Sequence, residues 1–261
     1  MRCSVVIPFK DRLPALKQAV ASVGAQTAKC DELILVNDGG EEPDLQEFKN
    51  LFGSVFECVQ LPQSQGAAFA RNEGARRATG ELLCFLDSDD EWNREHLATG
   101  LALLSAHPEV EFLATSYGAA TPTRKFHDGD GLFLVESVPE FQFGNGGSFR
   151  TSGFIIRKES FWSVDGFDAE QEKHQDWDLA MRAWESGLVV GFNRRSTVII
   201  DSGAEGRMSY NPNPEASLRF YIRHKSFMDS SHRWSFRKGV VKSMIKRSRL
   251  SGWGAVAKTF L

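Results

Sequence analysis

The sequence predicts an α/β fold, a doubly wound and mostly parallel sheet with helices on both faces. Within residues 1–92, short apolar runs alternate with stretches of helical periodicity, which is typical of strands joined by crossover helices. The run Leu82–Leu86 is apolar throughout, as expected for a strand buried on both faces. Polar residues follow this strand and two others, at the carboxyl ends where open α/β sheets bind ligands.

Each element of the first half has a local signal. The first strand ends at Pro8, which lacks the amide hydrogen that a sheet ladder needs. Leu13, Leu16, Val20 and Val23 recur at helical spacing, and residues 37–40 have turn composition. We expect strands at Ser4–Pro8, Glu32–Val36, Val55–Leu61 and Leu82–Leu86, and helices at Leu13–Gln26, Leu45–Phe52 and Ala67–Ala78.

The second half is less regular. Residues 118–150 are rich in Gly, Phe and charge and show no steady period, whereas Gly187 marks the end of a helix. Residues 211–214 break the chain with two prolines. We expect helices at Glu95–Ala106, Lys158–Val164 and Asp178–Ser186, and strands at Val110–Thr115, Phe154–Arg157, Val189–Phe192 and Thr197–Ile200.

The charge is divided unevenly along the chain. The 261 residues have a formal net charge of −3, yet residues 216–261 hold eleven Lys and Arg residues and a single acid, Asp229. A basic tail on an acidic body predicts a negatively charged partner for the tail. We do not expect that partner to be a nucleic acid.

Composition also predicts the compartment. Four cysteines lie in or beside apolar runs without CxxC spacing, as small core residues of a reduced protein do. The apolar run before Pro8 is too short for a signal peptide, and no stretch approaches the ~20 apolar residues of a membrane span. We expect a cytoplasmic protein.

The tail contains a predicted helix, Trp234–Leu250, whose apolar residues fall on one side. A basic amphipathic helix of this kind can lie on an anionic membrane, at the inner face of the cell membrane in this case. The alternative is a helix whose apolar face packs on the body of the protein or on a second subunit. The apolar set is Phe236, Val240, Val241, Met244 and Ile245, interleaved with Arg237, Lys238, Lys242, Lys246 and Arg247.

The acids at residues 87–91 indicate a cation. Asp87, Asp89, Asp90 and Glu91 repel one another unless a positive group joins them, and carboxylate oxygens are ligands for Mg²⁺ or Mn²⁺. A second interpretation is a helix capping box formed by Ser88 and Glu91. The capping box explains the later acids and leaves Asp87 without a role.

Other polar groups are predicted to reach the same edge of the sheet. Parallel strands place Pro8-Phe9 and Asn37-Asp38 beside the acids. Arg71 falls on a helix rich in small residues, where a buried guanidinium needs a carboxylate or a phosphate. Neither GxGxxG nor GxxxxGK[ST] occurs, which argues against a dinucleotide fold or a P-loop.

A second acidic pair, Asp176 and Asp178, precedes a helix. A helix needs only one of them as its N-cap. Asp178 lies nearer the helical run, so we assign the cap to Asp178 and expect Asp176 to face a cleft. A helix N-terminus favours the ionised carboxylate, so Asp176 is expected to serve as a base at neutral pH.

These motifs resemble glycosyltransferase family 2 in their order along residues 3–210. They are Ser4–Pro8, Val36-Asn37-Asp38-Gly39, Ala70-Arg71-Asn72 within Gly66–Gly74, Phe85–Asp90, Gly166-Phe167-Asp168 and Gln175–Leu179. The resemblance implies the GT-A fold and inversion at the anomeric carbon. We expect a glycosyltransferase domain at 1–212 (a nucleotide-binding half, 1–95, and an acceptor-binding half, 96–212). The charge and the break at residues 211–214 predict a basic helical C-terminal extension at 213–261.

The resemblance also implies roles for single residues. Asp38 contacts a uracil base, Pro8 and Phe9 line that pocket, and Arg71 lies near the nucleotide. Asp87, Ser88 and Asp89 form the DxD motif, with Asp89 the direct metal ligand, and Asp176 matches the catalytic base. Two departures stand out: Gln175 replaces a usual Glu, and Asp201-Ser202-Gly203 lacks the His often found there.

We therefore expect an inverting glycosyltransferase that needs Mn²⁺ or Mg²⁺ and uses a UDP-sugar donor. Its acceptor is expected to be a surface glycan or a lipid-linked precursor. One alternative is a sugar nucleotidyltransferase, although Lys10-Asp11-Arg12 lacks the glycine-rich loop such an enzyme has after its first strand. The other is a non-catalytic nucleotide- or sugar-binding protein of the same fold.

Overall fold

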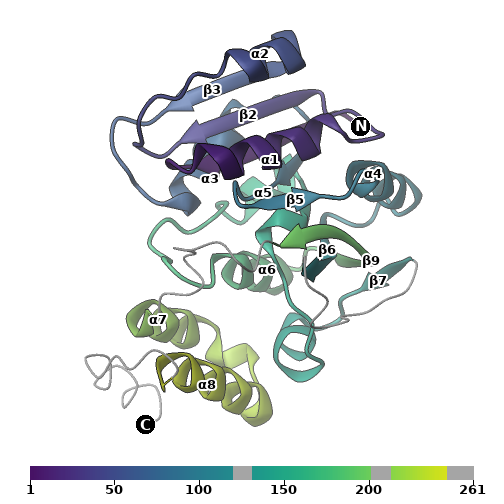
Figure 1. Ribbon diagram of the computed structural model, residues 1–261. Coiled ribbons are helices and arrows are strands. Elements are labelled where there is room, and N and C mark those ends of the chain that lie inside the picture. The colour runs from purple at the N-terminus through teal and green to yellow at the C-terminus, as the bar shows by residue number, and fades with distance from the viewer. Residues whose placement is uncertain (120–130, 201–212, 246–261) are drawn as a thin grey trace.

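A computed structural model describes residues 1–119, 131–200 and 213–245 (Figure 1). Within these residues, nine strands form one sheet in the order β3-β2-β1-β4-β8-β6-β9-β5, and β7 pairs with β9. The strands are β1 Cys3–Phe9, β2 Glu32–Asn37, β3 Phe56–Gln60, β4 Leu82–Phe85, β5 Asp90–Trp92, β6 Phe112–Ala119, β7 Leu132–Leu134, β8 Phe154–Arg157 and β9 Val190–Ile200.

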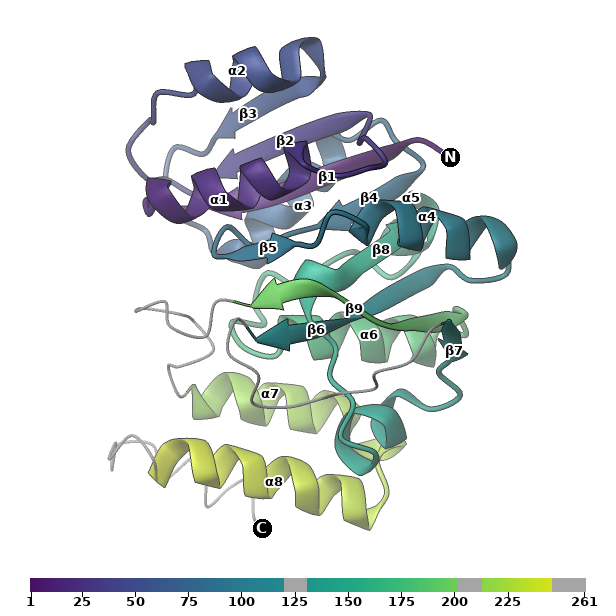
Figure 2. The same ribbon diagram turned by 45° about the vertical axis from the view of Figure 1, so that its right-hand side comes forward.

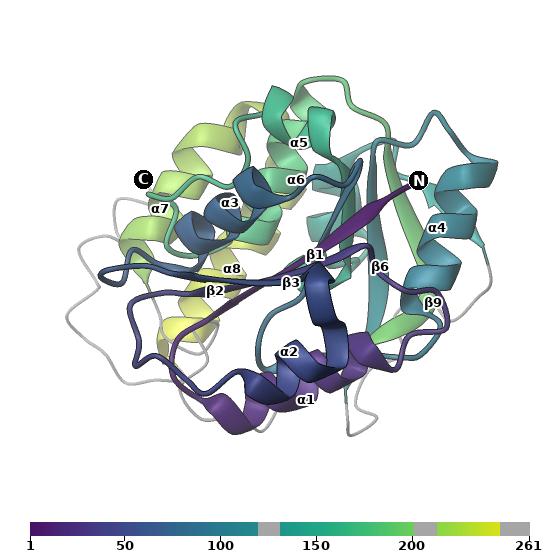
Figure 3. The same cartoon turned by 90° about the horizontal axis from the view of Figure 1, so that it is seen from above.

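Helices cover both faces of the sheet (Figure 3). Alternate residues of β1 point to opposite faces: Val5 and Ile7 pack against α1, α2 and α4, whereas Val6 packs toward α3, α5 and α6. The helices are α1 Leu13–Gly24, α2 Gln46–Phe52, α3 Ala67–Arg77, α4 His96–Ala106, α5 Lys158–Ser163, α6 Gln175–Glu185, α7 Pro214–His224 and α8 Ser230–Ile245. Short helical turns are η1 Gly53–Val55, η2 Glu140–Gly144, η3 Thr151–Gly153 and η5 Lys225–Phe227.

The first half is the predicted parallel sheet. Strands β3, β2, β1 and β4 run parallel in register, with Val6 of β1 opposite Ile34 of β2 and Phe85 of β4. Gly74 lets α3 approach the sheet, since a Cβ there would lie 2.4 Å from Cγ1 of Val6. The small residues of α3 thus pack this helix closely against the sheet.

The second half adds antiparallel pairs. β8 runs antiparallel to both β4 and β6, so its amino end meets the carboxyl end of β4. Residues 90–92 form β5, paired with β9, so the capping-box interpretation of Ser88 and Glu91 is wrong. The two strands predicted within residues 189–200 are one continuous strand, β9, which β6 follows with a register shift between Thr115 and Tyr117.

The C-terminal helices α7 and α8 pack on the same core as α6 (Figure 2). Phe236, Val240 and Met244 of α8 are buried, as the packing alternative predicts. Trp234, on another face of α8, is 63% exposed. Residues 246–250 of the predicted helix, and Asp201-Ser202-Gly203, lie outside the described residues. Among the described helices, none combines the length and apolar character that a membrane crossing requires.

Candidate active site

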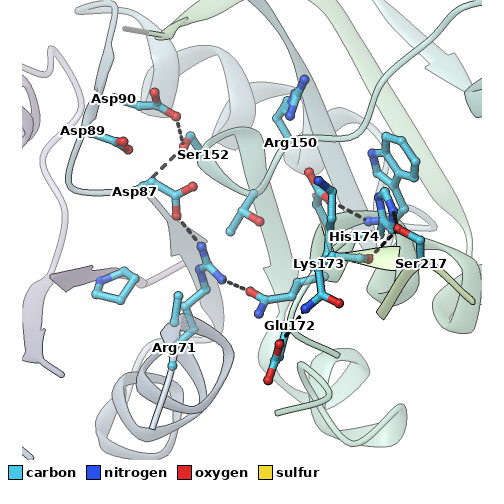
Figure 4. Close-up of a pocket in the computed structure, with 18 of the residues that line it drawn as sticks. Arg71, Asp87, Asp89, Asp90, Arg150, Ser152, Glu172, Lys173, His174 and Ser217 are labelled. Carbon is cyan, nitrogen blue, oxygen red and sulfur yellow. Dashed lines mark hydrogen bonds and ion pairs between the residues drawn. The ribbon is translucent and has the colours of Figure 1, made fainter. Parts of the chain in front are cut away.

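A cavity of about 900 Å³ lies at the carboxyl ends of β1, β2 and β4, and α6, α7 and α8 line its other side (Figure 4). The acids of residues 87–90 and the His174–Ser217 pair lie on opposite sides of this cavity in the close-up. All the site residues predicted from the sequence line it: Pro8, Phe9, Asp38, Arg71, Asp87, Ser88, Asp89 and Asp176.

Three carboxylates form a cluster at one side of the cavity. Oxygen atoms of Asp87, Asp89 and Asp90 all lie within 4.8 Å of one another. Ser152 Oγ holds the cluster by donating to Oδ2 of Asp90 at 2.6 Å and accepting from the backbone N–H of Asp87 at 3.2 Å. Such a set of hard oxygen donors fits Mg²⁺ or Mn²⁺.

Arg71 is the buried cation next to this cluster. Only 4% of its surface is exposed, and its guanidinium donates to Oδ1 of Asp87 at 2.5 Å and to Oε1 of Gln175 at 2.8 Å. The prediction that a buried Arg71 needs an anionic partner is therefore confirmed, with Asp87 as that partner. Gln175, which departs from the family pattern, accepts one of the Arg71 hydrogen bonds.

Asp38 holds the loop before α3. Its carboxylate accepts from the backbone N–H groups of Gln65 at 2.7 Å and Gly66 at 3.0 Å, and from Oγ of Ser64 at 2.8 Å. These bonds fix the end of β2 against the entrance of α3, with Asp38 6% exposed. A contact between Asp38 and a uracil base stays a prediction.

Asp176 lies in the first turn of α6 and lines the cavity. Burial raises the pKa of the Asp176 carboxyl, and the nearby Arg150 guanidinium partly offsets this increase. The direction is opposite to the one expected from the helix N-terminus, because removal from water outweighs the helix dipole. Asp176 is therefore a stronger base, when ionised, than an exposed Asp.

Asp178 does not cap α6, so that prediction is wrong. His174 stands at the N-cap position with φ of 63°, and no side chain caps the helix. The Asp178 side chain is instead fully buried, and it accepts hydrogen bonds from Arg182, Arg223 and His224 at 2.8 to 2.9 Å. It joins α6 to α7 beneath the cavity.

Arg150 and Ser152 are the site residues that sequence reasoning missed. Arg150 lines the cavity, stacks over the Tyr117 ring at 5.3 Å, and lies close enough to Asp176 to lower its pKa. Its Nε has no hydrogen-bond partner within the described residues. Both residues precede β8, and only the antiparallel direction of β8 brings them to the acids.

Comparison with known proteins adds independent findings. Residues 4–165 match the family model described as Glycosyl transferase family 2. AmsB, an amylovoran biosynthesis glycosyltransferase of Erwinia amylovora, is 29% identical over an alignment 202 residues long that covers 71% of this chain. The chain spans only 64% of the length of AmsB.

Two solved structures show the fold. S. aureus TarS (residues 1–349) in complex with UDP-GlcNAc has a TM-score of 0.76 at 15% identity, over 99% of this chain and 79% of that chain. GalNAc-T7 with UDP, GalNAc and Mn²⁺ has a TM-score of 0.65 at 18% identity, over 95% of this chain and 56% of that chain. The predicted GT-A fold is thereby confirmed.

Proposed function

Because the chain belongs to glycosyltransferase family 2, we propose that it moves a sugar from a UDP-sugar to a hydroxyl of a glycan or lipid-linked acceptor, with inversion. One observation carries this proposal. A cluster of three carboxylates and the separate carboxylate of Asp176 line the same cavity. The reaction needs both a cation site for the leaving diphosphate and a base for the acceptor.

The donor side is assigned to the ends of the parallel strands. Pro8, Phe9 and Asp38 would hold the uracil, and Asp87 and Asp89 would hold Mn²⁺ or Mg²⁺. The cation, when bound, supplies Lewis-acid stabilisation of the negative charge on the leaving UDP. Arg71 fixes Asp87 in place and is assigned to the nucleotide side of the cavity. TarS, whose fold this chain shares, was solved with UDP-GlcNAc.

The acceptor side is assigned to α6. The oxygen of the acceptor hydroxyl attacks the anomeric carbon while Asp176 accepts the proton of that hydroxyl. The bond between the anomeric carbon and the diphosphate breaks in the same step. A single displacement of this kind inverts the anomeric carbon. Arg150 stabilises the ionised form of Asp176 before the reaction.

The setting is proposed from the relatives and from the tail. AmsB is named for amylovoran biosynthesis, and we assign this chain to surface polysaccharide synthesis at the cytoplasmic face of the membrane. Within the chain, residues 1–95 are proposed to bind the nucleotide, 96–212 the acceptor, and 213–261 to form the extension.

A screen of nucleotide sugars for slow hydrolysis in the presence of Mn²⁺ tests the proposal. We expect UDP release from one or a few UDP-sugars and none from the Asp89→Asn variant. Pyrophosphate release from UTP and a sugar phosphate would instead indicate a nucleotidyltransferase. Binding of UDP-sugars without turnover, with or without candidate acceptors, would indicate a non-catalytic protein.

A further inference from the structure

Arg150 lines the cavity and forms no ion pair within the described residues. Its Nε is buried and has no hydrogen-bond partner there. A buried guanidinium is costly unless an anion joins it. The other two arginines that line the cavity each pair with an acid of the carboxylate cluster, as Arg71–Asp87 and Arg12–Asp89.

The surroundings of Arg150 hold it in place without matching its charge. Its guanidinium stacks on the Tyr117 ring, 5.3 Å from the ring centre, and its carbonyl accepts from the backbone N–H of Gly153 at 3.0 Å. Asp176 and Asp90 attract its charge through space without forming an ion pair with it. Asp176 is not a lasting counter-ion, because in the proposed reaction it takes up a proton at each turnover. Once Asp176 is protonated, Arg150 needs another anion.

Arg150 lies beside the path between the two reacting sugars. In the close-up it stands between the carboxylate cluster and the His174–Ser217 pair (Figure 4). The cluster is assigned to the diphosphate and Asp176 to the acceptor hydroxyl, so the transferred sugar and the reacting hydroxyl lie between these two groups. A substituent on one of the two sugars is therefore placed to meet Arg150.

The chemistry of Arg150 favours a carboxylate over a hydroxyl or a phosphate. A hydroxyl leaves the charge of the guanidinium unmatched, whereas a carboxylate accepts two parallel hydrogen bonds from its planar fork. The donor diphosphate has the cation site and Arg71 on its own side of the cavity. A phosphate on the acceptor would bring up to two negative charges toward Asp176 and Asp90, and a carboxylate brings one.

We propose that Arg150 binds the carboxylate of a uronic acid, on either the sugar that is transferred or the sugar that accepts it. The inference rests on the proposed glycosyl transfer and names the class of sugar at that site. The carboxylate replaces Asp176 as the partner of Arg150 when Asp176 receives the proton. Arg150 thereby selects an acidic sugar.

Binding of matched neutral and acidic sugars tests this assignment and separates the two sources of the carboxylate. For the donor, calorimetry with Mn²⁺ compares UDP-glucose with UDP-glucuronate and UDP-galactose with UDP-galacturonate. For the acceptor, it compares methyl glucoside with methyl glucuronide and methyl galactoside with methyl galacturonide, with UDP and Mn²⁺ filling the donor side. We expect the acidic member of at least one pair to bind at least about tenfold more tightly, as one charge-assisted hydrogen bond allows.

Three variants assign this preference to Arg150. Arg150→Met should remove the preference for the acidic sugar and leave the affinity for its neutral counterpart almost unchanged. Arg150→Lys should keep part of the preference, because it retains the charge and loses the planar fork. Arg195→Met is the matched control and should keep the full preference, since it removes an exposed arginine outside the cavity lining.

Equal affinity for both members of every pair, or an unchanged preference in folded Arg150→Met, would overturn the assignment. Tighter binding of glucose 1-phosphate than of methyl glucuronide would overturn it too. If Arg150→Met weakened UDP itself as much as the acidic UDP-sugar, Arg150 would belong to the diphosphate instead. Release of UDP from a neutral UDP-sugar, measured in the same samples, would support the proposed function even where the uronic acid assignment fails.

Discussion

Asp176 and Asp178 lie two positions apart in α6, and their surroundings shift their pKa values in opposite directions. Burial raises the pKa of Asp176. Burial also opposes ionisation of Asp178, but hydrogen bonds from His224 and Arg182 lower its pKa to about 2. Asp178 is therefore a permanent anion of the folded protein, and Asp176 is the carboxylate available to exchange a proton.

Replacing Asp176 by Asn tests the assignment of the base. We expect kcat to fall by about 10²–10⁴-fold, since the proton of the acceptor hydroxyl loses its acceptor. Affinity for UDP should hardly change, because Asp176 acts on the acceptor. Glu172→Gln, another acid that lines the cavity, is the control. A nearly normal kcat, or an NMR spectrum showing retained anomeric configuration in the wild-type product, would refute the assignment.

Arg150 is expected to set the pH at which Asp176 works. The base is active when ionised, so activity falls as the pH drops through the raised pKa of Asp176. The Arg150 guanidinium lowers that pKa, and Arg150→Met should therefore move the acidic limb of the kcat/KM profile to higher pH. Activity should suffer more at low pH than at high pH. Loss of activity by the same factor at every pH would show that Arg150 acts in another way.

The metal assignment predicts a selective loss in Asp89→Asn. Asp89 contributes an oxygen to the carboxylate cluster, so the variant should lose both transfer and the Mn²⁺-dependent part of UDP binding while keeping its circular dichroism spectrum. Glu91→Gln removes a nearby charge outside the cluster and should behave like wild type. Unchanged UDP affinity with Mn²⁺ in Asp89→Asn, measured by calorimetry, would exclude Asp89 as a ligand.

Whether a site residue could be located from the sequence depends on the direction of the strand next to it. Asp38 and Asp87 could be located from the sequence, because the carboxyl ends of parallel strands share one edge. Ser152 could not, because it precedes β8, and a four-residue apolar strand carries no local sign that it runs antiparallel. The pKa of Asp176 also depends on burial by segments far away in the sequence.

Among the elements, α6 and α7 are joined by a buried ionic cluster. Nε2 of His224 lies 2.9 Å from Asp178 and Nδ1 lies 2.7 Å from Glu185. Burial opposes protonation of His224, but these two carboxylates raise its pKa above the ordinary value of 6.5. The folded chain therefore holds this proton more tightly than the unfolded chain does.

This cluster predicts how stability depends on pH. The contribution of His224 to the free energy of unfolding is complete below pH 6.5 and is lost as the pH rises through the raised pKa of His224. His224→Gln should lower the free energy of unfolding by about 3 kcal/mol at low pH, and by less at about pH 9, in urea titrations. His107→Gln, which removes an exposed pair with Glu109, should change little. If the difference in free energy of unfolding between the wild type and His224→Gln grew as the pH rises, this mechanism would be contradicted.

The elements that the sequence predicted well are those with strong periodicity, such as α1 and α4. The elements that it predicted poorly depend on long-range pairing. β5 has only three residues, two of them acidic, and exists because Asp90–Trp92 pair with the end of β9. The sequence predicts two strands in place of β9 because Asn193-Arg194-Arg195-Ser196 is polar. In the structure, pairing with β6 continues on both sides of that segment.

For the whole molecule, α8 and α2 lie at opposite ends of the structure (Figure 1). The α8 end carries Trp234, Lys238 and Lys242, and we expect the protein to float with vesicles that contain anionic lipid. Because each lysine near such a surface contributes about 1 kcal/mol, Lys238→Glu with Lys242→Glu should reduce the bound fraction at least about tenfold. The matched control reverses Lys29 and Lys49, which are exposed near α1 and on α2. Equal flotation of both double variants would rule out this face.

The place of α8 in the chain has a consequence for synthesis. The parallel strands and the carboxylate cluster come from residues 3–90, whereas the wall opposite them belongs to the last helix described. Domains tend to fold as the chain emerges, from the N-terminus onward. A nascent chain thus exposes the residues of its donor side well before Ser152, which holds the carboxylate cluster, and α8 have left the ribosome, so the two sides of the cavity come together only late in synthesis.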